Sequence, residues 1–320
     1  MGSSSTVSRY ERARALVGGI LSAKPHVGPP APAWVQAALI LLASVLFGGQ
    51  FVAFKKSFEA IGPSTLLALR PILALPLMLL LMRWAREPIA VERASLRRVL
   101  VPATLLTVSF VTFMFGVHRL PVGITSTFVS TTPIFSIGLG LLAGMQRVGA
   151  VAVAGSFAGV LGVAIATGVT SGDADALGLG LLALTNLTYA LSLIAYRKME
   201  IRISSAIYLI VMMAECAVLF VPLAIVLDGF SMHWTWGSAL GFAYIVTFGQ
   251  IAAYVTVVAL VRVAGAFQSS LTTPLVPVFA IFFAFLVLDD PLLGRELAGG
   301  VLIVVGVVAA ILPARRRPCA

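Results

Sequence analysis

Ten long runs of apolar residues, nearly free of charge, fill most of this 320-residue chain and limit its possible folds more than any other feature. A transmembrane helix needs about 20 consecutive, mostly apolar residues, and each run is close to that length. Hydrophobic residues make up 60% of the chain and charged residues only 11%, a composition that excludes an ordinary soluble domain. The sequence therefore predicts an all-α membrane protein with ten transmembrane helices and no soluble domain.

The expected helices follow the apolar runs, with polar or basic segments at both ends of the chain. Residues 1–33 are polar, basic and Pro-rich near their end, which predicts a disordered cytoplasmic tail, and residues 315–320 form a second, basic tail. The expected helices cover residues 35–54, 64–82, 99–117, 123–142, 148–168, 177–196, 204–226, 238–260, 268–288 and 296–313.

Lysine and arginine are distributed very unevenly between the two sides of this arrangement. If the N-terminus is cytoplasmic, 17 of the 22 basic residues fall in cytoplasmic segments, and only Lys55, Lys56, Arg119 and Arg295 lie on the other side. Cytoplasmic loops carry such an excess, so we expect a multi-pass protein of the inner (plasma) membrane with both termini in the cytoplasm. The net charge of +10 then reflects topology and anionic lipid, and nucleic acid is not an expected partner.

The second half of the chain repeats the first. A shift of 144 residues pairs Pro133 with Pro277 and Gly155 with Gly299, among other small and polar residues. We therefore expect two repeats, residues 34–170 and 171–314, of five helices each. Because five is an odd number, the second repeat must cross the membrane in the opposite direction, as in many secondary transporters whose substrate lies near the midplane between the halves.

Two full charges lie inside the apolar runs, Arg70 in the second expected helix and Glu215 in the seventh. A charge at the bilayer centre costs about 2.5 to 3.5 kcal/mol on insertion scales, so neither should face lipid. They could pair with each other, or each could face a cavity and bind one end of a zwitterion. Arg70 could also extend to the outer interface, since it lies early in its helix. Glu215 is the candidate for coupling transport to protons.

Two expected helices carry stripes of polar and aromatic residues, which could line a wet cavity or hold neighbouring helices together by hydrogen bonds. For the stripes as a whole we favour the cavity, so their residues are candidates for substrate binding, as is Gln50 in the first helix. The stripe of the eighth helix contains Tyr244, Thr247, Gln250 and Tyr254, and that of the sixth contains Thr185, Tyr189, Ser192 and Tyr196 beside Asn186.

Several short segments resemble the EamA-type family of the drug/metabolite transporter superfamily, over about residues 35–312. They are 46–51 followed by Lys55, 66–70, 272–279 followed by Asp290, and 299–306. Phe47 stands where the family usually has Trp, and Gln146-Arg147 and Asp289-Asp290 stand where it has Glu. The resemblance implies that the fifth and tenth helices are peripheral and that the others enclose a central cavity serving export, less often uptake, of small metabolites.

We expect a secondary transporter, an exporter of small polar or amphipathic metabolites such as amino acids or their derivatives, acting by alternating access. The expected partners are a small-molecule substrate, the lipid bilayer and, as a coupling ion, the proton, and the protein would be a monomer or homodimer. A vitamin or drug transporter is the alternative. An intramembrane enzyme is disfavoured because His26, His118 and His233 fall in the tail or near the outer surface, and no cofactor or metal site is expected.

Overall fold

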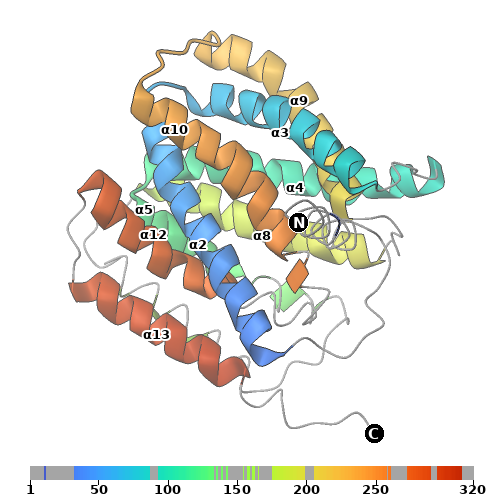
Figure 1. Ribbon diagram of the computed structural model, residues 1–320. Coiled ribbons are helices and arrows are strands. Elements are labelled where there is room, and N and C mark those ends of the chain that lie inside the picture. Colours follow the sequence, from blue (N-terminus) through green and yellow to red (C-terminus); the bar gives the residue numbers. More distant parts are fainter. Residues whose placement is uncertain are drawn as a thin grey trace, which may run out of the picture.

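In a computed structural model the chain folds as a bundle of long helices that cross one another at varied angles (Figure 1). The structure describes residues 32–86, 93–132, 175–198, 205–257, 259–260, 272–289 and 294–311, together with Glu11 and isolated helical positions between 135 and 165. Most of the predicted tails and most of residues 133–174, which include the predicted helix at 148–168, lie outside this description.

The observed helices follow the predicted ones closely. Five are long and apolar enough to cross a membrane, and shorter apolar helices include Ala176–Ser192 and Leu275–Leu288. The fold class is confirmed as all-α in the part described. The helices are α2 (Ala33–Phe58), α3 (Pro63–Ala85), α4 (Arg93–Arg119), α5 (Val122–Val129), α8 (Ala176–Lys198), α9 (Ser205–Asp228), α10 (Trp236–Tyr244), the π-helix η2 (Ile245–Ala252), α12 (Thr272–Leu288) and α13 (Gly294–Ile311).

The main helix contacts join the two halves of the chain rather than neighbours in sequence. Helix α4 packs on α8 and α9, α3 packs on α9 and η2, α2 packs on α12 and α10, and α5 packs on α12 and α8. If α2, α3, α4 and α5 are exchanged with α8, α9, α10–η2 and α12, this set of contacts maps onto itself. The two halves therefore pack in an equivalent way. Helices α3 and α9 correspond to each other in the two halves and lie side by side in Figure 1.

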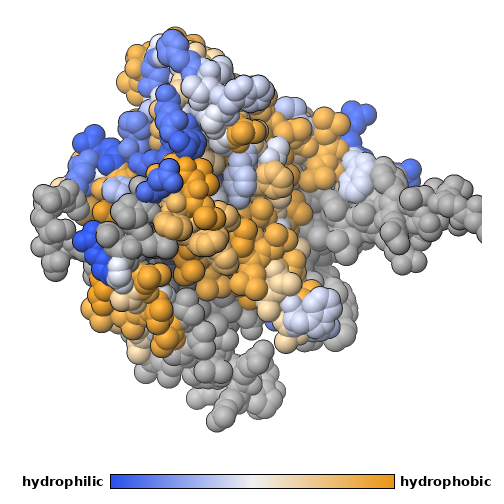
Figure 2. Space-filling model, turned by 60° about the vertical axis from the view of Figure 1, so that its left-hand side comes forward, coloured by the Kyte–Doolittle hydropathy of each residue, from blue (hydrophilic) through white to orange (hydrophobic). Residues whose placement is uncertain are grey.

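The outer surface of the bundle is apolar. Large hydrophobic side chains point outward along several helices, with exposed fractions of 63% for Leu80, 73% for Val218 and 66% for Leu240. Figure 2 shows hydrophobic residues over much of one face, with hydrophilic residues gathered mainly along one side. Such a surface is unfavourable in water and suits lipid, where the backbone hydrogen bonds of helices are satisfied internally.

Two loops interlock at one end of the bundle. The carboxylate of Asp228, the last residue of α9, accepts a hydrogen bond from the Thr65 backbone N–H over 2.7 Å and so caps the first turn of α3. The His233 N–H donates to the Ala60 carbonyl over 3.0 Å, and Ile61 forms an isolated bridge with Met232. A side chain at Gly62 would clash with Asp228, because its Cβ would lie 2.4 Å from Oδ2. The halves are thus locked together at this end.

Candidate substrate site

A small pocket lies where α3, α4, α9 and η2 meet. Both halves of the chain contribute four residues to its lining. They are Leu67, Arg70, Pro71 and Phe110 from the first half, and Met212, Met213, Cys216 and Gln250 from the second.

Arg70 is the charged residue of this lining, and it is buried, with 5% of its side chain exposed. Its guanidinium carbon lies 4.8 Å from the centre of the Phe110 ring and 5.9 Å from that of Phe54. Its Nε has no hydrogen-bond partner among the residues that the structure describes. Arg70 therefore does not extend to the interface, and aromatic rings are the groups that stabilise its charge.

Gln250 reaches the same pocket from η2 and is 2% exposed, and its Oε1 likewise finds no partner in the described part of the chain. The π-helix explains why the predicted stripe is only partly retained. Hydrogen bonds from i to i+5 change the rotation per residue, so spacings that assume 3.6 residues per turn no longer mark one face. Thr247 lies on the exposed side and its hydroxyl donates to the Ala243 carbonyl, away from Gln250.

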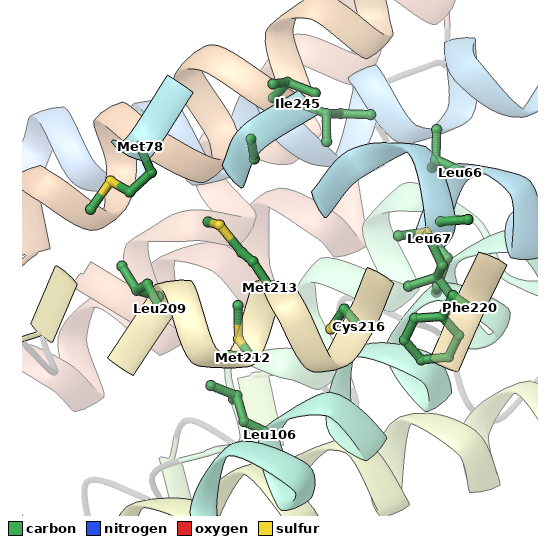
Figure 3. Packing of buried hydrophobic residues seen from close by; sticks show 14 of the residues in the cluster. Leu66, Leu67, Met78, Leu106, Leu209, Met212, Met213, Cys216, Phe220 and Ile245 are labelled. Atoms are coloured by element: carbon green, nitrogen blue, oxygen red, sulfur yellow. The ribbon is translucent and has the colours of Figure 1, made fainter. Parts of the chain in front are cut away.

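The remaining wall of the pocket is apolar and flexible. Figure 3 shows Met212, Met213 and Cys216 on α9 within the buried cluster that also contains Leu67 and Leu106. Methionine side chains are unbranched and polarisable, so they adapt to apolar groups of different shape. The pocket thus combines one cation and one amide with a soft apolar wall.

Glu215 is directed away from this pocket. Its Oε2 accepts a hydrogen bond from the Thr104 hydroxyl of α4 over 3.3 Å, and it is not part of the lining. Glu215 and Arg70 form no ion pair, since the salt bridges among the described residues are Lys56–Glu59 and Arg119–Asp175. Of the alternatives that the sequence left open for these two charges, direct pairing is therefore not seen in the structure.

Asn186 lies in a different environment, at the contact of α8 with the end of α5. Its amide Nδ2 donates to the Phe128 carbonyl over 3.0 Å and to the Thr131 hydroxyl over 2.9 Å. Its Oδ1 accepts from the Thr132 hydroxyl over 2.8 Å. The neighbouring Thr185 shares a hydrogen bond of 2.8 Å with Thr112 of α4. This part of the α8 stripe has the geometry of a structural contact between helices.

Among the other candidate residues, Gln50 lies on α2, and Tyr244 and Tyr254 contact α2. The Tyr244 hydroxyl donates to the Leu46 carbonyl over 3.1 Å, and the Tyr254 ring contacts Phe47 edge-to-face with centres 5.7 Å apart. Gln50 is buried against Gly249, where a Cβ would lie 2.9 Å from its Cδ. Tyr189 packs against the large core cluster, and the Tyr196 side chain lies outside the described residues.

Sequence reasoning missed most of the pocket lining, including Phe110, Met212 and Cys216. One signal was available, because the repeat shift of 142 residues that pairs Lys56 with Lys198 leads from Arg70 to Met212. The structure places both residues in the pocket. The same site in the two halves thus carries a guanidinium in one and a thioether in the other.

Comparison with known proteins agrees with this architecture. A family model described as the EamA-like transporter family matches the chain twice, over residues 34–168 and 176–312. The chain belongs to this family, which makes it a membrane transporter with a duplicated domain and a small-molecule substrate. Helix α13, the predicted tenth span, has its main contacts with α12 alone among the described elements, as expected of a peripheral helix.

Solved structures support the fold as well. One, titled only "Crystal structure of protein", has a TM-score of 0.68 and 16% sequence identity, and the alignment covers 89% of this chain and 99% of that chain. At this identity the likeness concerns the fold alone. None of the curated proteins compared with the chain matches it.

Proposed function

We propose that this protein is a secondary transporter that exports small polar or amphipathic metabolites, such as amino acids or their derivatives, by alternating access of its two halves. The observation that supports this most directly is the pocket between α3, α4, α9 and η2, where both halves contribute and the buried Arg70 Nε has no hydrogen-bond partner among the described residues. Substrate sites of transporters built from repeats lie at the repeat interface.

An intramembrane enzyme is not supported, because among the described lining residues Cys216 is the one nucleophile and neither a histidine nor a carboxylate accompanies it.

The proposed orientation places both termini in the cytoplasm of an inner-membrane protein with inverted halves. The uneven distribution of Lys and Arg and the equivalent packing of the halves support it. A reporter fused after Ala320 should be cytoplasmic, and one inserted between Ser171 and Ala176 should be external. An external C-terminus would contradict the inverted arrangement.

Under this orientation the interlocked loops close the external end. Besides the Asp228 cap, Lys55 donates to the His118 carbonyl over 3.5 Å, and Arg119 pairs with Asp175 there. These contacts must separate before a substrate leaves outward, which supports a cycle that exposes the pocket to the two sides in turn.

Glu215 remains the proposed coupling residue, acting from α9 through its contact with α4. Glu215→Gln keeps the size of the side chain and its ability to accept from Thr104, so the variant should reach the membrane normally. If Glu215 carries the coupling proton, transport by this variant should no longer depend on the pH gradient. Gradient-driven transport at the parent rate would exclude the role.

Reconstituted vesicles test the function itself. The protein should move a labelled amino acid or amino-acid derivative across the vesicle membrane, and Gln250→Leu should reduce that flux at least about tenfold. Thr247→Ala is the matched control, because Thr247 lies on the same helix but on its exposed side. Equal loss in both variants, or no flux above that of empty vesicles for any compound of this class, would refute the proposal.

A further inference from the structure

We infer that the pocket accepts a small apolar monocarboxylate whose amino group is absent or masked, with one N–H or O–H donor beside the carboxylate. The inference rests on the proposed function and narrows its substrate class. It distinguishes hydroxy acids and N-acylated amino acids from free amino acids. Three features of the described lining support it, namely its positive charge, the lack of an acidic residue, and an unsatisfied acceptor beside an apolar wall.

The first feature is a permanent positive charge with no negative partner. A guanidinium cannot lose its proton in a protein, and burying a charge without a counter-charge is strongly unfavourable. The rings of Phe110 and Phe54 offset part of this cost. A carboxylate ligand removes the rest, because its two oxygens match the planar fork of donors that arginine presents.

The second feature is the lack of an acid for an ammonium group. No Asp or Glu is among the lining residues that the structure describes. Glu215, which precedes Cys216 on α9, accepts a hydrogen bond from Thr104 and is not part of that lining. The other acids whose side chains the structure describes within its helical bundle, Glu59, Asp175, Asp228 and Asp289, lie in loops or at helix ends. A free ammonium in this space would meet the like charge of Arg70 with nothing to balance it, which disfavours zwitterions and cations.

The third feature is the unsatisfied Oε1 of Gln250. A buried acceptor without a donor costs about 1–3 kcal/mol, so a ligand that brings one donor gains more than a ligand that brings none. Hydroxyl and amide groups provide such a donor without adding a charge. Met212, Met213 and Leu67 then suit an alkyl or aromatic body of limited size.

Five probes with the same isobutyl group test the inference by isothermal titration against the purified full-length protein in lipid nanodiscs. They are 4-methylpentanoate, 2-hydroxy-4-methylpentanoate, N-acetylleucine, leucine and leucinamide. We expect 2-hydroxy-4-methylpentanoate and N-acetylleucine to bind at least about tenfold more tightly than leucine. We expect 4-methylpentanoate, which lacks the donor, to bind less tightly than these two compounds and more tightly than leucine. We expect leucinamide not to bind.

Variants assign this preference to the two polar residues. Gln250→Leu should weaken 2-hydroxy-4-methylpentanoate and N-acetylleucine to the level of 4-methylpentanoate, whose own affinity should not change. Arg70→Met should weaken the three carboxylates that lack a free amino group at least about 100-fold, and Thr247→Ala should alter none of the affinities. If Arg70→Met does not fold, the ranking of the probes on the parent protein and on Gln250→Leu decides the question.

Several results would overturn the inference. They are binding of leucine or leucinamide as tight as that of 2-hydroxy-4-methylpentanoate, no binding of any carboxylate probe, or Gln250→Leu affecting 4-methylpentanoate equally. Flux of free leucine in reconstituted vesicles that is lost in Gln250→Leu would overturn it while leaving the proposed function intact. Absence of flux for every class of metabolite would instead remove the proposed function.

Discussion

Two buried polar sites within the same bundle differ in whether their hydrogen bonds are satisfied. At the contact of α8 with α5, all three described bonds of Asn186 end on Phe128, Thr131 and Thr132 of the chain itself. In the pocket, Arg70 Nε and Gln250 Oε1 have no partner among the described residues. Burial is similar, with exposed fractions of 1% for Asn186 and 2% for Gln250.

This difference separates structural from functional polarity inside a membrane protein. A satisfied polar group adds to the attraction between helices, whereas an unsatisfied one destabilises the empty protein and is compensated when a ligand arrives. An apolar substitution at Asn186 should therefore lower the stability of the protein. An apolar substitution at Gln250 should instead weaken ligand binding and leave stability almost unchanged.

Of the two buried polar sites, the one at Asn186 should show the larger effect on stability, on substitution by leucine. The substitution removes three hydrogen bonds, and at an average of about 0.6 kcal/mol for each in a membrane protein the free energy of unfolding should fall by about 2 kcal/mol. Unfolding in mixed detergent–lipid micelles measures it. Gln250→Leu is the matched variant and should lower stability by less than about 0.5 kcal/mol, since it breaks no bond within the chain. Equal losses would remove the distinction between the sites.

Two glycines sharpen the comparison by testing how rigid the surroundings of α2 are. A Cβ at Gly48 would lie 2.6 Å from the Phe279 Cβ and 2.9 Å from the Ala280 backbone N, so Gly48→Ala must push α12 away. We expect a loss of about 1–3 kcal/mol, as for overpacked cores. A Cβ at Gly249 would meet only the flexible Gln50 side chain among its three nearest atoms. Gly249→Ala should therefore cost clearly less, in the same unfolding assay.

Asp228 is an acid outside the membrane core whose carboxylate has a hydrogen-bond partner, the Thr65 N–H at the start of α3. Asp228→Ala removes the acceptor for the Thr65 N–H, and losing a helix cap typically costs about 1 kcal/mol. The unfolding midpoint should fall accordingly, while Glu59→Gln at the exposed pair with Lys56 should have almost no effect. An unchanged midpoint for Asp228→Ala would show that the interlocked loops do not depend on this cap.

The smallest effect concerns the exposed pair of Arg119 and Asp175. The hydrogen bond from Arg119 lowers the pKa of the Asp175 carboxyl below its ordinary value, so folding favours the ionised form. The stabilisation is present above the ordinary pKa of about 4 and is lost as the pH falls through the lower folded pKa. The difference in unfolding midpoint between the parent and Asp175→Asn should therefore be small at pH 7 and should vanish at strongly acidic pH.

The sequence identified several residues of the candidate site but did not show which of them lie together. Arg70, Gln250, Gln50 and Tyr254 were predicted because polar residues are rare in apolar runs, and the structure brings Arg70 and Gln250 into one pocket. Thr247 was grouped with them by a 3.6-residue spacing that the π-helix breaks. Whether Glu215 pairs with Arg70 could not be read from the sequence, and in the structure the Glu215 carboxylate accepts a hydrogen bond from Thr104 instead.

The sequence alone determined the helices, the duplication and the membrane class, because the bilayer acts as a solvent on each apolar run separately and local composition suffices to predict the result. Only the tertiary structure decided which polar groups meet. The rotation of each helix depends on side-chain packing between segments far apart in the sequence. Helices α3 and α9, and likewise α2 and α12, are more than 100 residues apart, and Phe128 of α5 and Asn186 of α8 are 58 residues apart. That packing leaves Asn186 satisfied and leaves Arg70 and Gln250 open to a ligand.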